Sequence, residues 1–128
     1  MKTLVLLDTN FLFLPHQQRI DIFSEIPYIV PEAHELVTLS TVVSELEKLS
    51  CLRSEDGVAA RIGLELLKRN GVQVIPAEGS ADQTIVDYAV ENKASIVVCT
   101  NDAELRRMLK RNGIALITLR GKKHIIRL

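Results

Sequence analysis

Four acidic residues follow the carboxyl ends of predicted strands, which is where functional side chains usually lie in a parallel sheet. Asp8 directly follows the aliphatic run Leu4–Leu7, which predicts a strand buried on both faces. In open α/β sheets, ligands bind outside the carboxyl ends of the strands. Carboxylates that meet there repel one another unless a cation lies between them. The residues that follow predicted strands in this way, called the four acids below, are Asp8, Glu45, Asp82 and Asp102.

Carboxylates without a His or Cys cluster favour hard cations that bind oxygen, chiefly Mg²⁺ or Mn²⁺. One such ion lowers the pKa of a bound water to make a nucleophile, and a second ion stabilises the leaving oxygen. This chemistry indicates hydrolysis of a phosphodiester, with one or two ions. The histidines are not interpreted as ligands, because His16, His34 and His124 are scattered without an i, i+4 pair.

Each of the four acids also has an ordinary interpretation, as a helix cap or a solvated surface group. The agreement of all four positions favours a site over this alternative. Glu104 lies two residues after Asp102 and is a candidate additional ligand. Asp87 is a weaker substitute for Asp82, because it lies five residues further along the same predicted helix, about 140° round its axis.

The formal net charge of zero hides a strong asymmetry along the chain. The last 24 residues contain eight basic and no acidic residues, whereas the first 104 contain eight basic and sixteen acidic residues. This separation predicts an acidic centre beside a surface that binds a polyanion. The alternative is that Arg106 to Arg111 simply form the solvated face of a helix. On the polyanion hypothesis, the residues expected to contact its phosphates are Arg106, Arg107, Lys122 and Lys123.

Length and composition exclude several other classes of protein. The chain has 128 residues, which predicts a single domain spanning residues 1–128. Aromatic residues make up 4% of the chain, too few for a stacking platform of the RNA-recognition type. No apolar run is long enough to cross a bilayer, and the run that ends at Asp8 is too short for a signal peptide. We therefore expect a cytoplasmic protein without a membrane partner.

Strand and helix patterns alternate along the chain. This order predicts a three-layer α/β/α domain with a mostly parallel central sheet of about five strands. The predicted strands are residues 4–7, 36–39, 72–75, 95–98 and 114–119, with 124–126 as a short edge strand or a tail. The principal predicted helices are residues 40–49, 58–69, 82–90 and 102–111.

Local rules predict where some of these elements begin and end. A short helical turn is expected to stop before Pro15, and a helix over residues 19–26 is expected to end at Pro27. Ser40 or Thr41 is predicted to cap the helix that follows the second strand, because a hydroxyl can accept from the free N–H groups of a helix start.

Four motifs occur in order along the chain: Leu6-Leu7-Asp8-Thr9-Asn10, Val43-Ser44-Glu45-Leu46, Ala81-Asp82 and Thr100-Asn101-Asp102-Ala103-Glu104-Leu105-Arg106-Arg107. Together they resemble the PIN domain (PilT N-terminus) family, and the resemblance covers nearly the whole chain. Within that family the chain looks closest to the ribosomal-RNA-processing nucleases and their stand-alone archaeal relatives, and less like the toxins of toxin–antitoxin pairs. The branch is indicated by Glu45-Leu46-Glu47-Lys48-Leu49, Ala81-Asp82 and Leu119-Arg120-Gly121-Lys122-Lys123.

The resemblance implies a metal-dependent endoribonuclease that cleaves RNA, with a role in ribosomal RNA processing. A homo-oligomer, and protein partners in an RNA-processing assembly, are compatible with it. The implied catalytic residues and ligands of Mg²⁺ or Mn²⁺ are Asp8, Glu45, Asp82 and Asp102. The residues implied to support these ligands or to contact substrate are Asn10 and Thr100.

One residue departs from the family pattern. Members of this branch commonly carry two adjacent aspartates where this chain has Asp82-Gln83. Because glutamine carries no charge, the alternative is a catalytically weak or inactive PIN fold that binds RNA or protein. A nucleotide-binding or phosphoacceptor domain fits less well, because the chain has no glycine-rich phosphate loop.

Overall fold

The computed structural model describes residues 2–128, which form one six-stranded sheet with helices on both sides. The strand order is β3-β2-β1-β4-β5-β6. Neighbouring strands are parallel except β5 and β6, which are antiparallel. The strands are β1 (Thr3–Leu7), β2 (His34–Leu39), β3 (Gln73–Ile75), β4 (Ile96–Cys99), β5 (Ala115–Arg120) and β6 (His124–Arg127).

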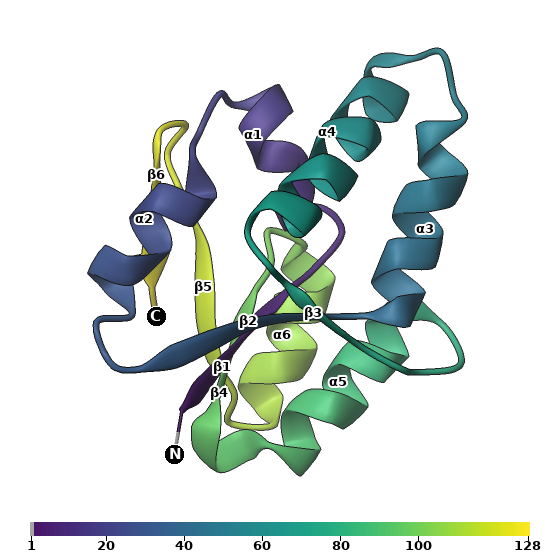
Figure 1. Ribbon diagram of the computed structural model, residues 1–128. Coiled ribbons are helices and arrows are strands. Elements are labelled where there is room, and N and C mark those ends of the chain that lie inside the picture. Colours follow the sequence, from purple (N-terminus) through teal and green to yellow (C-terminus); the bar gives the residue numbers. More distant parts are fainter. Residues whose placement is uncertain (1) are drawn as a thin grey trace.

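The helices form the two outer layers and confirm the predicted α/β/α architecture. They are α1 (Leu14–Gln17), α2 (Ile22–Ile29), α3 (Ser40–Ser50), α4 (Glu55–Arg69), α5 (Ala81–Glu91) and α6 (Ala103–Arg111), with 3₁₀ turns η1 (Phe11–Phe13) and η2 (Lys93–Ser95). Figure 1 shows α5 and α6 below the sheet, α1, α2 and α4 above it, and α3 at the end of β2. None of the helices within residues 2–128 is both long and apolar enough to cross a membrane.

The two central strands position the candidate site. Leu6 and Leu7 of β1 and Val98 of β4 are fully buried. Strands covered on both faces need apolar side chains at successive positions, which explains why these runs lack polar alternation. Because Leu6 pairs with Val98 in a parallel register, the next polar residues, Asp8 and Thr100, emerge at the same edge of the sheet.

The two prolines differ from the prediction in different ways. The short turn expected before Pro15 is present as η1, which ends at Phe13, but the helix α1 follows it directly. Pro15 lies in the first turn of α1, where its missing N–H removes no intrahelical hydrogen bond. Pro27 lies inside α2, which begins after Asp21 rather than at residue 19. The helix begins there because the Asp21 carboxylate accepts a hydrogen bond from Ser24 N at 3.2 Å. Burial of the apolar face of α2 sustains the helix past the one hydrogen bond that Pro27 cannot make.

Candidate active site

Asp8 is the most buried of the four acids, with 4% of its surface exposed at the end of β1. Its carboxylate accepts hydrogen bonds from Thr9 N at 2.7 Å and from Thr100 Oγ1 at 2.7 Å. Burial nevertheless raises the pKa of Asp8 to about 6, and the negative charges of Asp82 and Glu45 add to this effect. The charge of Asp8 is therefore held in a place where a cation would stabilise it.

Thr100 and Asn10 tie the end of β1 to the end of β4. The Thr100 hydroxyl donates its one hydrogen to Asp8 and accepts from Asp102 N at 3.1 Å. Asn10 Oδ1 accepts from Asn101 N at 3.1 Å and lies 3.4 Å from Thr100 Oγ1. These contacts orient the Asp8 carboxylate and fix the backbone that leads into Asp102.

Asp102 opens α6 and caps it. Its Oδ1 atom accepts hydrogen bonds from Glu104 N at 2.9 Å and from Leu105 N at 3.1 Å. The ordinary interpretation of this acid, as an N-cap, is therefore correct. The cap uses one carboxylate oxygen, and Oδ2 stays outside it. A capping role and a ligand role are compatible for this side chain.

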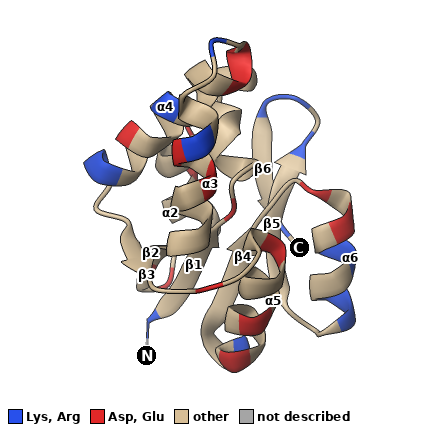
Figure 2. Cartoon of the chain, turned by 90° about the vertical axis from the view of Figure 1, so that its right-hand side faces the viewer, with Lys and Arg blue, Asp and Glu red and all other residues tan. Residues whose placement is uncertain are grey.

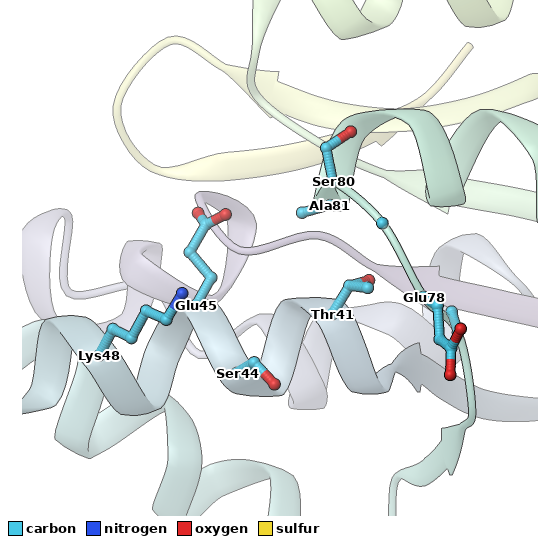
Figure 3. A pocket seen from close by; sticks show the side chains of 9 residues that line it. Thr41, Ser44, Glu45, Lys48, Glu78, Ser80 and Ala81 are labelled. Carbon is cyan, nitrogen blue, oxygen red and sulfur yellow. The ribbon is translucent and has the colours of Figure 1, made fainter.

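Glu45 and Asp82 approach the same edge from two helices. Glu45 is exposed on α3, and Figure 3 shows its carboxylate pointing toward the start of α5. Asp82 lies in the first turn of α5. Burial raises the pKa of Asp82, and the negative charges of Asp102 and Glu104 raise it further. The negative charges of Glu45 and Asp82 thus act on Asp8, and the negative charge of Asp102 acts on Asp82.

The donor chemistry of this edge fits a hard divalent cation. The candidate ligands are carboxylates, and the neighbouring Thr9 hydroxyl is buried without a hydrogen-bond partner among residues 2–128. As the side chains stand, no three His, Cys, Asp or Glu residues within that range lie close enough to hold one ion. Without a cation, repulsion between the carboxylates favours conformations in which these side chains stay apart. Glu45 and Asp82 are exposed, so their side chains are free to rotate toward Asp8.

The two substitute acids differ in position. Gln83 Nε2 donates to Asp87 Oδ1 at 2.9 Å, and Asp87 lines a separate hollow beside Tyr88. Asp87 is therefore not brought to the four acids, whereas Glu104 affects the pKa of Asp82 directly. The histidines contact other groups: His16 contacts Glu55, His34 contacts the Glu32 carbonyl, and His124 contacts Glu25.

The basic residues near the C-terminus gather on α6 and at the tip of the β5–β6 hairpin. Figure 2 shows both regions in blue, with the red first turn of α6 between them in that view. Arg107, Lys122 and Lys123 are exposed. Arg106 is half-buried, and its Nε has no hydrogen-bond partner within residues 2–128.

Arg127 differs from these basic residues, because it has a structural partner. Its two terminal nitrogens each lie 2.9 Å from a carboxylate oxygen of Glu32. The Arg127 guanidinium lowers the pKa of Glu32 to about 2. Arg127, one of the eight C-terminal basic residues, thus holds β6 against the segment after α2.

The hydroxyls expected to cap α3 have other partners. The helix begins at Ser40, and no side chain accepts a hydrogen bond at its N-cap. Ser40 Oγ donates to Ala77 O at 3.0 Å and accepts from Ala77 N at 2.9 Å. The prediction that Ser40 or Thr41 caps this helix is therefore wrong, because both hydroxyls bind across to the segment that leads into α5 or to α5 itself.

Thr84 is a supporting residue that the sequence did not reveal. It is buried on α5, and its hydroxyl donates to Ser80 O at 2.8 Å. It therefore accepts a hydrogen bond from Thr41 Oγ1, which lies 2.8 Å away. This pair joins the helix that carries Glu45 to the helix that carries Asp82. The available signal was one polar residue on the otherwise apolar face of α5.

Comparisons with known proteins identify the family to which this sequence is similar. A family model described as "PIN like domain" matches residues 5–122. Ribonuclease VapC4 of Methanocaldococcus jannaschii is 34% identical over 120 residues, covering 91% of this chain and 90% of that protein. The rRNA-processing protein FCF1 of Saccharomyces cerevisiae is 30% identical over 127 residues, covering 95% of this chain and 62% of that protein.

A solved structure extends this similarity to three dimensions. The PIN domain endonuclease Utp24 has a TM-score of 0.77 and 28% sequence identity, covering 97% of this chain and 90% of that chain. The family match over residues 5–122 and the 34% identity to a relative of nearly equal length confirm the resemblance seen in the motifs. This chain belongs to the PIN-like domain family.

Proposed function

We propose that this protein is an endoribonuclease that hydrolyses RNA phosphodiesters with the help of Mg²⁺ or Mn²⁺. The observation that carries the proposal is the approach of four carboxylates from separate elements to one edge of the sheet, where Asp8 is buried with a pKa of about 6. The names of similar proteins support the substrate class, because one is a ribonuclease and another is a PIN domain endonuclease.

Divalent metal, when held by the four acids, would supply a water of lowered pKa and a positive charge for the leaving oxygen. The contribution of the chain is to hold the carboxylates in position. Thr100 orients Asp8 through a 2.7 Å hydrogen bond, and the Thr41–Thr84 pair fixes the two helices that bear Glu45 and Asp82. Loss of such supporting contacts typically lowers metal affinity or activity about ten- to a hundredfold.

We also propose that the exposed basic residues of α6 and the β5–β6 hairpin hold the RNA backbone. Arg107, Lys122 and Lys123 face solvent, and Arg106 has a buried nitrogen in need of an acceptor. The similarity to FCF1, which is named for rRNA processing, supports ribosomal RNA as the target. Because this chain spans 62% of that protein, the assignment to rRNA concerns the shared domain.

Cleavage of a labelled single-stranded RNA by purified protein tests this function. Internal cleavage is expected with Mn²⁺ or Mg²⁺, with loss in EDTA and recovery when metal is added in excess. Asp87→Asn is the matched control, because Asp87 faces a different hollow and should not affect cleavage. RNA that binds but stays intact at every metal concentration would contradict the proposal.

The second candidate function is a PIN-fold scaffold that binds RNA or protein with little or no activity. Two observations favour it. No three candidate ligands within residues 2–128 lie close enough to hold an ion. The uncharged Gln83 is hydrogen-bonded to Asp87. RNA affinity that is equal in Mn²⁺ and in EDTA, without cleavage, would identify a scaffold.

A further inference from the structure

A polar hollow lies beside Glu45, between α3 and the segment that leads into α5. Its volume is about 510 Å³, which falls in the usual range for small-ligand sites. One wall is a single face of α3, and residues 77–81 form the opposite wall, as Figure 3 shows. We call this space the α3 hollow. Its residues from α3, at spacing i, i+3, i+4 and i+7, are Thr41, Ser44, Glu45 and Lys48.

Hydrogen bonds hold the two walls of the α3 hollow in place. Ser40 Oγ both donates to and accepts from the backbone of Ala77, at 3.0 and 2.9 Å. Thr41 Oγ1 lies 2.8 Å from Thr84 Oγ1. Because these bonds exist without a ligand, a ligand would enter a preformed space, which reduces the entropy lost on binding.

Two groups in the α3 hollow are available to a ligand. The Lys48 ammonium forms no ion pair with any of residues 2–128. The Ser44 side chain is exposed and lines the hollow, and its hydroxyl makes no hydrogen bond within that range. By contrast, the hydroxyls of Thr41 and Ser80 already have partners in α5. A cation and a hydroxyl one helical turn apart are thus the free hydrogen-bond donors that this wall offers.

The lining of the α3 hollow selects the class of ligand. It contains no aromatic side chain, so it does not offer the stacking surface that nucleobases favour. Two carboxylates, Glu45 and Glu78, outnumber the one lysine, so a phosphate is favoured only next to Lys48. The rest of the space suits an uncharged group with hydroxyls. A ribose matches this, because its 2′-hydroxyl both donates and accepts hydrogen bonds, as Ser44 does.

The position of the α3 hollow relates it to the phosphodiester that is cut. Glu45 belongs both to its wall and to the four acids, so a nucleotide in the hollow lies beside the proposed metal site. We propose that the α3 hollow binds one ribonucleotide of the substrate strand next to the cut, with Lys48 contacting its phosphate and Ser44 its 2′-hydroxyl. This inference rests on the proposed function, because it assumes that RNA reaches the four acids.

The path of the strand follows from the packing of the helices. The helix α5 packs against both α3 and α6. A strand held by the basic residues of α6 would therefore cross the start of α5, at Asp82, before entering the α3 hollow. Lys48 then gives the substrate a second point of attachment, on the opposite side of the cut from α6. The hollow would be the feature of this site that distinguishes RNA from DNA.

Binding without metal tests the hollow independently of cleavage. We would measure, in EDTA, the affinity of a single-stranded RNA of roughly 12 nucleotides and of DNA with the same sequence. Ser44→Ala should weaken RNA binding about two- to tenfold and leave DNA binding unchanged, because one hydrogen bond to the 2′-hydroxyl is lost. Lys48→Ala should weaken both and reduce the slope of log affinity against log salt by roughly 0.7. Lys68→Ala, on the exposed side of α4, is the control and should change neither.

Two results would overturn the inference. One is a ratio of RNA to DNA affinity that is the same in Ser44→Ala and in the wild type. The other is a salt slope for Lys48→Ala that equals the slope for Lys68→Ala.

A cleavage experiment with Mn²⁺ then locates the contact along the strand. Substrates that carry one 2′-deoxynucleotide each should reveal one position, next to the cut, where the substitution raises KM and leaves kcat unchanged. In Ser44→Ala that position should lose its sensitivity. Binding as expected without any cleavage would retain the hollow as an RNA site and refute the proposed function. Cleavage with a uniform response to deoxy substitution would refute the hollow and retain the function.

Discussion

The two sides of the candidate active site are held in different ways. On the strand side, Asp8 and Asp102 follow β1 and β4, and backbone N–H groups and the Thr100 hydroxyl bind their carboxylates directly. On the helix side, Glu45 and Asp82 are exposed. There the hydrogen bonds fix the helices that carry the acids rather than the carboxylates themselves.

This difference follows from where each acid leaves its element. The end of a buried central strand lies against neighbouring strands, which supply donors and exclude water. Glu45, in the second turn of α3, and Asp82, in the first turn of α5, are exposed to solvent, so these two side chains keep their rotamer freedom. We infer that the strand side sets the position of a bound cation and that the helix side adapts to it, which is a division between preorganised and mobile ligands.

Replacement of Asp8 by Asn should have the largest effect. It keeps the shape of the side chain and removes the charge, so cleavage should fall on the order of a thousandfold while the fold is retained. Asp102→Asn should behave alike. Asp82→Asn should lose less, because it lies on the adaptable side. Initial rates and far-UV circular dichroism of the three variants provide the measurement. Unchanged cleavage by Asp8→Asn, with contaminating nuclease excluded, would refute the enzymatic function.

The stability of the metal-free protein should depend on pH through Asp8. Because burial raises the pKa of Asp8 to about 6, the folded state keeps this proton at pH values where the unfolded chain has lost it. The free energy of unfolding should therefore fall as pH rises from about 4 to about 6, by about 3 kcal/mol, and then stay level. Denaturant unfolding in EDTA across this range measures the fall.

Two comparisons show whether Asp8 causes this fall. Asp8→Asn should lack it, and at pH 7 without metal this variant should be more stable than the wild type. Excess Mn²⁺ should reduce the fall in the wild type, since a bound cation favours the ionised carboxylate. Identical pH profiles for the two proteins in EDTA would show that the strand side carries no such electrostatic strain.

Removal of one supporting hydroxyl on each side should affect cleavage differently on the strand side and on the helix side. Thr100→Val removes the hydrogen bond to Asp8, and cleavage should fall roughly tenfold to a hundredfold, with weaker Mn²⁺ binding. Thr41→Val removes the bond to Thr84, which should lower stability by about 1 kcal/mol and cleavage much less. Equal losses of cleavage in the two variants would mean that both sides are equally preorganised.

The same contrast explains which parts of the site the sequence could predict. The buried strand before Asp8 and the capping position of Asp102 depend only on residues adjacent in the sequence, so local patterns predict them. The Ser40–Ala77 and Thr41–Thr84 contacts join residues 37 and 43 positions apart, and no local rule relates them. Pro27 shows the opposite failure, because a correct local rule was overridden when α2 buried its apolar face.

The smallest effect is expected from the basic surface, which lies outside both sides of the site. Replacing Lys122 and Lys123 with Ala should weaken RNA binding alike for all sequences. The slope of log affinity against log salt should fall by roughly 0.7 for each lost contact on single strands. The cut position should not change, because phosphate contacts orient the strand without reading its sequence. In cleavage, KM should rise and kcat should stay nearly constant, as expected when uniform binding is lost.

Lys68→Ala with Arg69→Ala, an exposed basic pair on α4, is the matched control. Salt dependence that is identical in the wild type and the Lys122/Lys123 variant would mean that these two charges are merely solvated. Arg106, Arg107 and Lys48 would then be the basic residues left to hold the RNA backbone.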